Sequence, residues 1–367
     1  LALTNGTPPS HCTESGGNAF LSAPFFSSKK GGAASYPEPC KWNIIAGGMM
    51  DERLTREIKE LLAKEGIKVF GFAPLPSPGE LEELLCSDYL DSLPDSLSYM
   101  KKPAWRDPRL FLSWARSAVC VALPYNTTRE SSTEHISKGR AWISRYAWGR
   151  DYHDLLRMKL KPVRSLLRAL GFKAKIAVDS FPVLERTLAQ RAGLGFIGNN
   201  GLLINPDFGS YLFLGEVLTD TEFPDAEAVV SLCRDCGKCV SACPSGALTG
   251  NGRVKPSLCV SSYNVEWKGE LPSSAPLLAG RLFGCDLCQE ACPYNRSAPL
   301  SDENGFEPGA GLFAPELNFF LNGGAEIMET LIKRTPLARR GARGLRLSAE
   351  RIRRECQTKS EETELSS

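Results

Sequence analysis

The chain contains the stretch Cys233-Arg-Asp-Cys236-Gly-Lys-Cys239-Val-Ser-Ala-Cys243-Pro244, and this stretch decides how its second half folds. The spacing C-x2-C-x2-C-x3-C-P is typical of bacterial iron–sulfur cluster sites. A second set follows, with Cys259 alone and then Cys285-Asp-Leu-Cys288-Gln-Glu-Ala-Cys292-Pro293. The two sets supply eight thiolates, as many as two [4Fe–4S] clusters need, so the sequence predicts a protein that moves electrons one at a time.

The spacing also predicts how the ligands divide between the clusters. Cysteines three apart in a tight loop can bind one cluster, whereas the cysteine before a proline is carried toward the other. We therefore expect two ligand sets, which are Cys233, Cys236, Cys239 and Cys292 for one cluster and Cys243, Cys259, Cys285 and Cys288 for the other.

Two other uses of cysteine fit the pattern less well. A zinc site needs only four ligands and does not require this motif twice over. Disulfides suit a short secreted chain better than one of 367 residues. Oxygen-sensitive thiolates point to a reducing compartment, the cytoplasm, as do five cysteines outside the motifs, which are Cys12, Cys40, Cys86, Cys120 and Cys356.

Composition predicts a globular protein with several parts. The chain is 42% hydrophobic and 23% charged, and it has no apolar run long enough for a transmembrane helix. We expect five segments, which are a disordered leader or mis-assigned start at 1–48, an α/β domain at 50–222, a ferredoxin-like domain with two [4Fe–4S] clusters at 226–305, a helical, HEAT-like segment at 306–357 and a disordered tail at 358–367. Translation from Met49 or Met50 is the alternative for the first segment.

Residues 50–222 alternate helical and extended patterns, which predicts α/β architecture. The expected helices cover 51–65, 153–170 and 183–192, and the expected strands cover 67–73, 117–124, 174–179, 202–204 and 210–219. The glycines of Gly193-Leu-Gly195-Phe-Ile-Gly198 follow a helix rather than a strand, so no dinucleotide site is predicted. Basic residues gather between Lys138 and Lys175 and again between Lys333 and Arg354, which suits either a polyanion such as RNA or two solvated helix faces.

Several further stretches resemble the epoxyqueuosine reductase family. They are Gly149-Arg-Asp-Tyr-His153, Val178-Asp179-Ser-Phe-Pro182-Val-Leu-Glu185-Arg186, Ala192-Gly-Leu-Gly-Phe-Ile-Gly-Asn-Asn200, Cys259-Val-Ser-Ser-Tyr263 and Phe283-Gly-Cys-Asp-Leu-Cys-Gln289. The resemblance covers about 50–345 and implies a cobalamin-dependent enzyme that reduces epoxyqueuosine to queuosine in the anticodon loop of tRNA. It implies that the clusters pass electrons to cobalamin, which no protein histidine ligates.

Asp179 is the candidate proton donor. It ends an apolar strand, where burial would raise the pKa of a carboxyl toward neutrality. By position alone, Asp179 is more often a residue that caps the following turn through Ser180 than a proton donor. The family resemblance reverses this order and favours the proton donor. Glu185 and Arg186 are weaker candidates because an exposed helical ion pair explains them equally well. His153 is expected to pack or hydrogen-bond near the site.

The resemblance implies further contacts. Cobalamin contacts are expected at Lys102, Asp179, Ser261, Asp286 and Leu287, and tRNA contacts at Trp267 and Lys268. Core packing is the alternative for Trp267. The chain departs from the family at Asn199, where lysine is usual, and its C-terminal helical part is short.

Two rival functions remain at this level. A reductive dehalogenase also combines cobalamin with two clusters, but that class usually carries a twin-arginine export signal, and residues 1–48 contain no arginine pair. A plain ferredoxin-type electron carrier would have no use for the large α/β domain. The leading prediction is thus a cytoplasmic, monomeric tRNA-modifying oxidoreductase that takes electrons from an external low-potential donor and binds no membrane.

Overall fold

The computed structural model describes residues 49–365 apart from 86, 106, 225, 227–229 and 310. The expectations for 1–48 lie outside these residues. At the centre of the α/β domain is a four-stranded sheet in the order β1–β2–β7–β4. These strands are β1 (Val69–Pro74), β2 (Ser117–Pro124), β7 (Leu212–Thr219) and β4 (Ala174–Ala177), and all three pairings are antiparallel.

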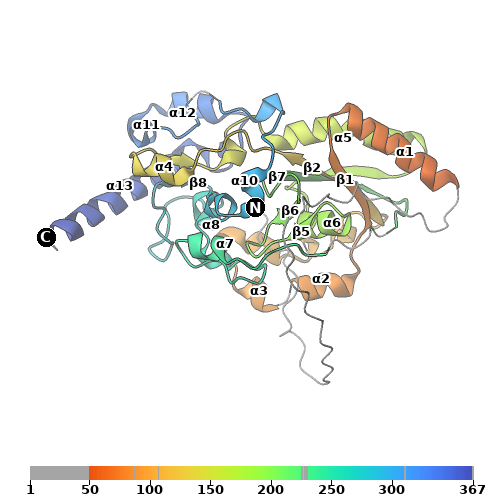
Figure 1. Ribbon diagram of the computed structural model, residues 1–367, viewed down its shortest axis with the longest axis horizontal. Coiled ribbons are helices and arrows are strands. Elements are labelled where there is room, and N and C mark those ends of the chain that lie inside the picture. Colours follow the sequence, from red (N-terminus) through yellow and green to blue (C-terminus); the bar gives the residue numbers. More distant parts are fainter. Residues whose placement is uncertain are drawn as a thin grey trace, which may run out of the picture.

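Helices cover both faces of this sheet (Figure 1). The helices α1 (Met49–Lys64) and α5 (Tyr152–Ala169) pack on one face, where they meet Val119 and Val121 of β2. On the other face α6 (Glu185–Arg191) packs against the alternate β2 residues Ala118 and Cys120. This alternation follows from the two-residue period of a strand, so the predicted α/β architecture is confirmed.

The approach of α6 to the sheet depends on one glycine. A Cβ atom at Gly71 of β1 would lie 1.9 Å from the carbonyl oxygen of Ala192, which follows α6. Only glycine leaves room for this contact, which lies at the C-terminal end of α6.

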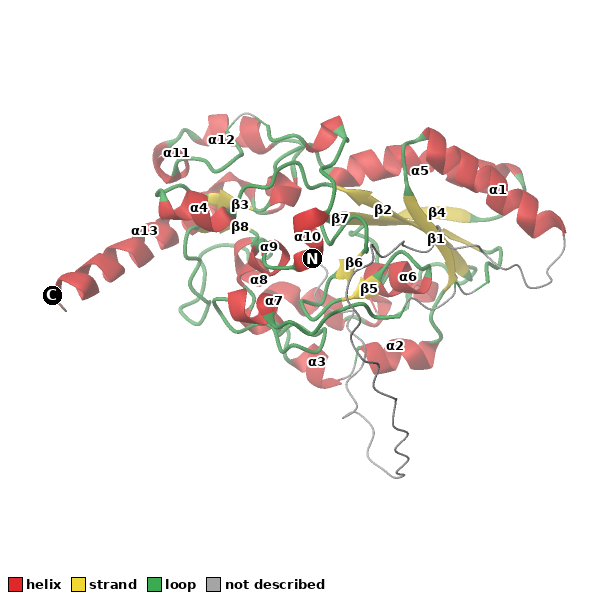
Figure 2. Ribbon diagram, viewed as in Figure 1, coloured by secondary structure: helices red, strands yellow, loops and turns green. Residues whose placement is uncertain are grey.

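The cysteine-rich segment is built from short elements (Figure 2). They are α7 (Lys238–Ala242), α8 (Val260–Asn264), β8 (Arg281–Phe283), α9 (Leu287–Glu290) and α10 (Pro293–Ser297). Strand β8 pairs in parallel with β3 (Trp142–Ile143), which belongs to the α/β part of the chain. The predicted α/β domain and the predicted ferredoxin-like domain therefore share a β-ladder and a hydrophobic core. They form one body.

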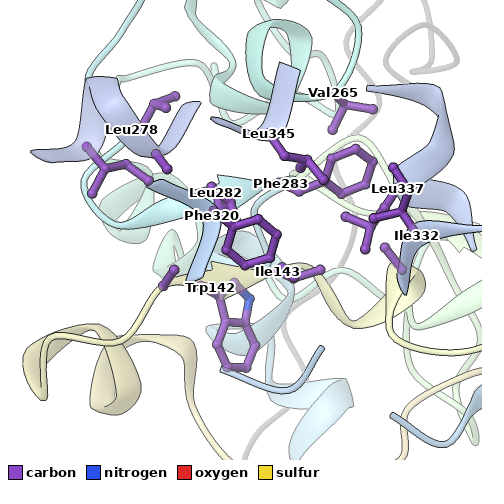
Figure 3. Close-up of a cluster of buried hydrophobic side chains, with 14 of the residues drawn as sticks. Trp142, Ile143, Val265, Leu278, Leu282, Phe283, Phe320, Ile332, Leu337 and Leu345 are labelled. Atoms are coloured by element: carbon purple, nitrogen blue, oxygen red, sulfur yellow. The ribbon is translucent and has the colours of Figure 1, made fainter. Parts of the chain in front are cut away.

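The C-terminal helices join the same core. They are α11 (Leu317–Asn322), α12 (Ala325–Ile332) and α13 (Gly341–Leu365). Figure 3 shows Leu345 of α13 beside Phe283 of β8, with Trp142 of β3 below them. Helix α13 continues to Leu365, into the segment 358–367 that the sequence predicted as a disordered tail. The remaining short elements are α2 (Pro78–Leu84), α3 (Ser87–Asp91), α4 (Ser132–Ser137), β5 (Phe196–Ile197) and β6 (Leu203–Ile204).

Among the helices of the described chain, none has both the length and the apolar character that a membrane span requires.

Candidate active site

The eight motif cysteines line two cavities in the grouping that their spacing predicts. A small cavity of about 30 Å³ is lined by Cys233, Cys236, Cys239 and Cys292, which we call the outer cage. A larger cavity of about 220 Å³ is lined by Cys243, Cys259, Cys285 and Cys288, which we call the inner cage.

The arrangement favours clusters over single metal ions. Within the part of the chain that the structure describes, no three His, Cys, Asp or Glu side chains converge closely enough to hold one metal ion. Four sulfurs spread around a cavity are what a cubic cluster needs, whereas zinc draws its ligands to a single point. Zinc is therefore the poorer occupant of both cages.

The four inner-cage cysteines are half-buried, and the protein packed around them affects their chemistry. Burial raises the pKa of Cys285 to about 12 and that of Cys288 well above its usual value. These sulfurs become thiolates only when a cation binds them, so metal binding and cage formation are coupled. The backbone N–H of Ala247 donates to Cys243 Sγ at 3.3 Å, which would lower the electron density on that ligand.

The larger cavity extends from the inner cage to the sheet. Apolar side chains form most of its wall, among them Leu203, Phe213, Leu214 and Val260. Of the predicted cobalamin contacts, Asp179, Ser261 and Leu287 line this cavity. An apolar cavity with a few polar groups between two parts of a protein is a typical ligand site.

Asp179 lies just beyond β4 in a constrained backbone conformation, with φ of 47°. Its backbone N–H donates to Glu185 Oε1 in a short hydrogen bond. Its carboxylate Oδ2 lies 3.3 Å from His153 Nε2, and His153 Nδ1 lies 2.7 Å from Asp151 Oδ1. The prediction that His153 hydrogen-bonds near the site is confirmed.

The side chain of His153 faces Asp179 and affects its protonation. Burial lowers the pKa of His153, but its hydrogen bonds to Asp151 and Asp179 outweigh burial and raise that pKa to about 9. Burial raises the pKa of Asp179, whereas the hydrogen bond and the charge of His153 lower it. Sequence position alone does not show which charge faces a carboxyl, and the role of Asp179 as proton donor stays a prediction.

The sequence did not single out Glu216, although an acid inside the apolar strand Leu212–Thr219 is an unusual signal. Its side chain is fully buried on the α6 face, and neither carboxyl oxygen has a hydrogen-bond partner. Burial and the nearby charges of Glu185 and Asp179 raise the pKa of Glu216 well above its usual value.

The exposed ion pair considered for Glu185 and Arg186 is wrong. Arg186 is 2% exposed, and none of its guanidinium nitrogens has a hydrogen-bond partner. Glu185 is partly buried, and both side chains line the larger cavity. Burial, followed by the charge of Asp179, raises the pKa of Glu185 to about 8.

The structure does not bring Asp286 or Lys102 to this cavity. Asp286 is fully buried and accepts hydrogen bonds from Trp142 Nε1 at 3.0 Å, from the Arg145 backbone N–H at 2.9 Å and from Ser144 Oγ. Through these hydrogen bonds, the Asp286 carboxylate fixes the loop that carries Cys285 against β3. Lys102 is exposed on another part of the surface.

Trp267 and Lys268 lie in the segment between Cys259 and Cys285. Trp267 is partly buried, stacks on Tyr263 and donates from Nε1 to the Glu270 carbonyl oxygen at 2.8 Å. Lys268 is exposed and donates to the Arg339 carbonyl oxygen. Packing within the protein therefore explains much of the position of the Trp267 side chain. The tRNA contacts of Trp267 and Lys268 remain predictions. Asn199 donates to Asp235 at 2.9 Å beside the outer cage.

Two family descriptions match parts of this chain. Residues 106–180 match "Epoxyqueuosine reductase QueG, DUF1730", and residues 232–295 match a 4Fe-4S double cluster binding domain. The second match covers all eight cage cysteines in one segment, including Cys259 and Cys285. Residues 232–295 are thus a double-cluster domain.

Curated relatives named epoxyqueuosine reductase align with this chain over different shares of their length. The protein of Synechocystis is 37% identical over 231 residues, 62% of this chain and 79% of the relative. That of Lactococcus garvieae is 32% identical over 267 residues, 72% of this chain and 76% of the relative. That of Shewanella oneidensis is 43% identical over 194 residues, 51% of this chain and 49% of the relative, so the chain spans about half the length of such relatives.

Solved structures show the same fold. An epoxyqueuosine reductase bound to an epoxyqueuosine-modified tRNA-Tyr stem loop superposes with a TM-score of 0.71 and 28% identity, covering 82% of this chain and 81% of that one. The Streptococcus thermophilus enzyme superposes with a TM-score of 0.67 and 28% identity, covering 81% and 80%. With two relatives above 30% identity covered over more than three quarters of their length, this chain belongs to the epoxyqueuosine reductase family.

Proposed function

We propose that this protein reduces epoxyqueuosine to queuosine in the anticodon loop of tRNA. The observation that carries the proposal is that the inner cage and Asp179 line one cavity. The proposed electron source and an ionisable carboxyl therefore face the same cavity, as reductive removal of an oxygen atom requires. The relatives' name and the stem loop bound by a structural neighbour support the substrate.

Cobalamin is the cofactor we propose for the space beyond the inner cage. The cavity is larger than the outer one, and it has amide and guanidinium groups without hydrogen-bond partners among the residues that the structure describes. The Nδ2 of Asn200 and the guanidinium of Arg186 are buried without hydrogen-bond partners, and both residues line the cavity. A corrin ring edged with amide side chains suits such groups, and Ser261 and Leu287 would hold it next to the inner cage.

When bound, cobalamin supplies low-potential reducing equivalents to the substrate, and the clusters supply single electrons. The chain's own residues do the rest. Asp179 delivers a proton to the oxygen released from the substrate, held in place by His153 and by the Glu185 carboxyl. Apolar residues such as Phe213 and Leu214 exclude water from the reducing site.

The outer cage is the proposed entry point for electrons. Cys236 is exposed, whereas the inner cage faces the larger cavity. An external low-potential donor would dock at the outer cage, and the protein would act as a monomer in the cytoplasm. A Bacillus subtilis epoxyqueuosine reductase has been solved with its Asp catalytic loop swung out of the active site, which supports an acid carried on a movable loop. In this chain Asp179 lies on the loop between β4 and α6.

The test compares modified nucleosides by mass spectrometry in tRNA from cells with and without this gene. Accumulation of epoxyqueuosine in the deletion strain, reversed by the intact gene, is the expected result. Normal queuosine in a deletion strain that has no second reductase would refute the assignment. Conversion of an epoxyqueuosine stem loop by the purified protein, reconstituted with clusters and cobalamin, completes the test.

A further inference from the structure

Three carboxyl groups and one imidazole gather around the end of β4. Asp179 contacts His153 through its side chain and Glu185 through its backbone N–H. Glu216 lies behind them in the sheet, with no hydrogen-bond partner for either carboxyl oxygen. The role proposed above for Asp179 leaves Glu185 and Glu216 unexplained. Buried acids cost stability, so their presence beside a reactive cavity points to a function.

The proposed reaction consumes two protons. Two carbon–oxygen bonds of the epoxide break, one carbon–carbon double bond forms, and the oxygen leaves as water. The change takes two electrons, which the iron–sulfur clusters supply one at a time from an external donor, and two protons. Asp179 has a single carboxyl, which lies 3.3 Å from His153 and can deliver one proton at a time, so another group must carry the second proton into the cavity.

We propose that Glu185 is this group, a proton-holding partner of Asp179 that supplies protons for the departing oxygen, a role that rests on the proposed function. Glu185 lines the same cavity as Asp179, and its Oε1 accepts the Asp179 backbone N–H. One oxygen of the carboxyl thus holds the Asp179 loop in place, and the other is left to carry a proton. Glu185 is therefore both a positioning residue and a proton store.

The ionisable groups around Glu185 favour its neutral form. Asp179 precedes it on the same loop, Glu216 faces it from β7, and the buried thiol of Cys120 faces it from β2. Tyr152 and His153 face it from α5, and Arg186 follows it on α6. The other strands packed on α6 are β1, β5 and β6, and they contribute no ionisable side chain. Two neighbouring carboxyls with little solvent do not ionise together.

His153 is the other protonated group nearby, and it is less suited to the task. Its two ring nitrogens face the carboxylates of Asp151 and Asp179, so each proton is held by a charged hydrogen bond. Loss of a proton from His153 would leave two facing carboxylates without their shared cation. Glu185 accepts a backbone N–H rather than a charged hydrogen bond, so the loss of its proton breaks no charged hydrogen bond.

The experiment measures turnover of an epoxyqueuosine stem loop against pH for the reconstituted enzyme. Glu185→Gln keeps an oxygen that can accept the Asp179 N–H but carries no transferable proton. We expect kcat to fall by about 10²-fold or more, with KM for the stem loop changed less than about threefold. The wild-type rate should fall as pH rises through about 8, where Glu185 loses its proton, and the residual rate of Glu185→Gln should lack this decline.

Two further variants distinguish this role from a structural one. Glu185→Asp, which keeps a titratable carboxyl, should restore a pH-dependent rate, and cobalamin binding and cluster absorbance should be unchanged in both Glu185 variants. Glu134→Gln, the same change at an exposed residue of α4 outside the cavity, should match the wild type. If the wild type converts the epoxide and Glu185→Gln equals it in kcat and pH profile, the role of Glu185 is overturned. If the wild type itself fails, the proposed function and this inference fall together.

Discussion

The two cages come from the same sequence motif but differ in their surroundings. The outer cage borders a cavity of about 30 Å³ and includes the exposed Cys236. The inner cage borders a cavity of about 220 Å³ that reaches Asp179, Glu185 and the sheet. The spacing of the cysteines therefore does not show which cage lies near solvent and which lies near the proposed substrate cavity. The difference supports the proposed direction of electron flow, in which electrons enter at the outer cage and leave at the inner one.

Buried hydrogen bonds also fix the inner cage to the rest of the protein. Asp286 follows Cys285 and accepts hydrogen bonds from Trp142 and from the Arg145 backbone. The Arg145 guanidinium contacts Glu290, which lies between Cys288 of the inner cage and Cys292 of the outer cage, at 3.0 Å. These buried bonds join the cysteine loops to β3. The Asp286 carboxylate, which the sequence predicted as a cobalamin contact, thus fixes the inner cage to β3.

The largest expected effect comes from removing one ligand from each cage in turn. Cys288→Ala should abolish turnover with any donor, because the inner cluster adjoins the cavity. Cys236→Ala should lose turnover with a protein donor but keep it with a small chemical reductant that enters the cavity. Iron analysis and stem-loop turnover measure both. Equal loss with both reductants in both variants would contradict the proposed direction of electron flow.

The next effect belongs to the acid in the larger cavity. Asp179→Asn removes a carboxyl without changing side-chain size, so both clusters and cobalamin should still bind. Turnover should fall by about 10² to 10⁴-fold, the usual contribution of a positioned acid or base. Cluster absorbance, cobalamin binding and nucleoside analysis measure the three properties separately. Full activity would exclude Asp179 as the proton donor.

A smaller effect concerns stability near the larger cavity. The folded-state pKa of Glu216 is raised above the ordinary 4.5, so its unfolded form loses a proton first as pH rises. The wild type should therefore lose stability above about pH 4.5 relative to Glu216→Gln, by up to about 1.4 kcal/mol per pH unit. Urea unfolding at pH 5, 6, 7 and 8 measures the difference. Parallel curves for the two proteins would show that Glu216 is ionised when folded.

The smallest effect lies outside both cages. Lys268 is exposed and carries one charge, so Lys268→Ala should raise KM for the stem loop a few-fold and leave kcat unchanged. The increase should shrink at high salt, because a phosphate contact releases counterions. Lys64→Ala, at the exposed end of α1, serves as the matched control. Identical KM values for the two variants would show that Lys268 does not contact tRNA.

Much of the fold followed from local patterns. The strand at 117–124 and the helices near 51–65 and 153–170 appear within about two residues of their predicted bounds. Short-range periodicity determines such elements, and cysteine spacing determined the grouping of the cages. The antiparallel order β1–β2–β7–β4 was not foreseen, because long connections separate the paired strands.

By itself, the sequence of this protein determined the ligands of both cages, the α/β and cysteine-rich parts, and Asp179 as an acid at a strand end. Only the tertiary structure decided that His153 faces Asp179, that Glu216 is buried behind Glu185, and that Asp286 supports the inner cage. Ligand spacing is a property of a few neighbouring residues. The charge on a carboxyl depends on burial and on partners far along the chain, which become neighbours only when the sheet, α5 and α6 pack together.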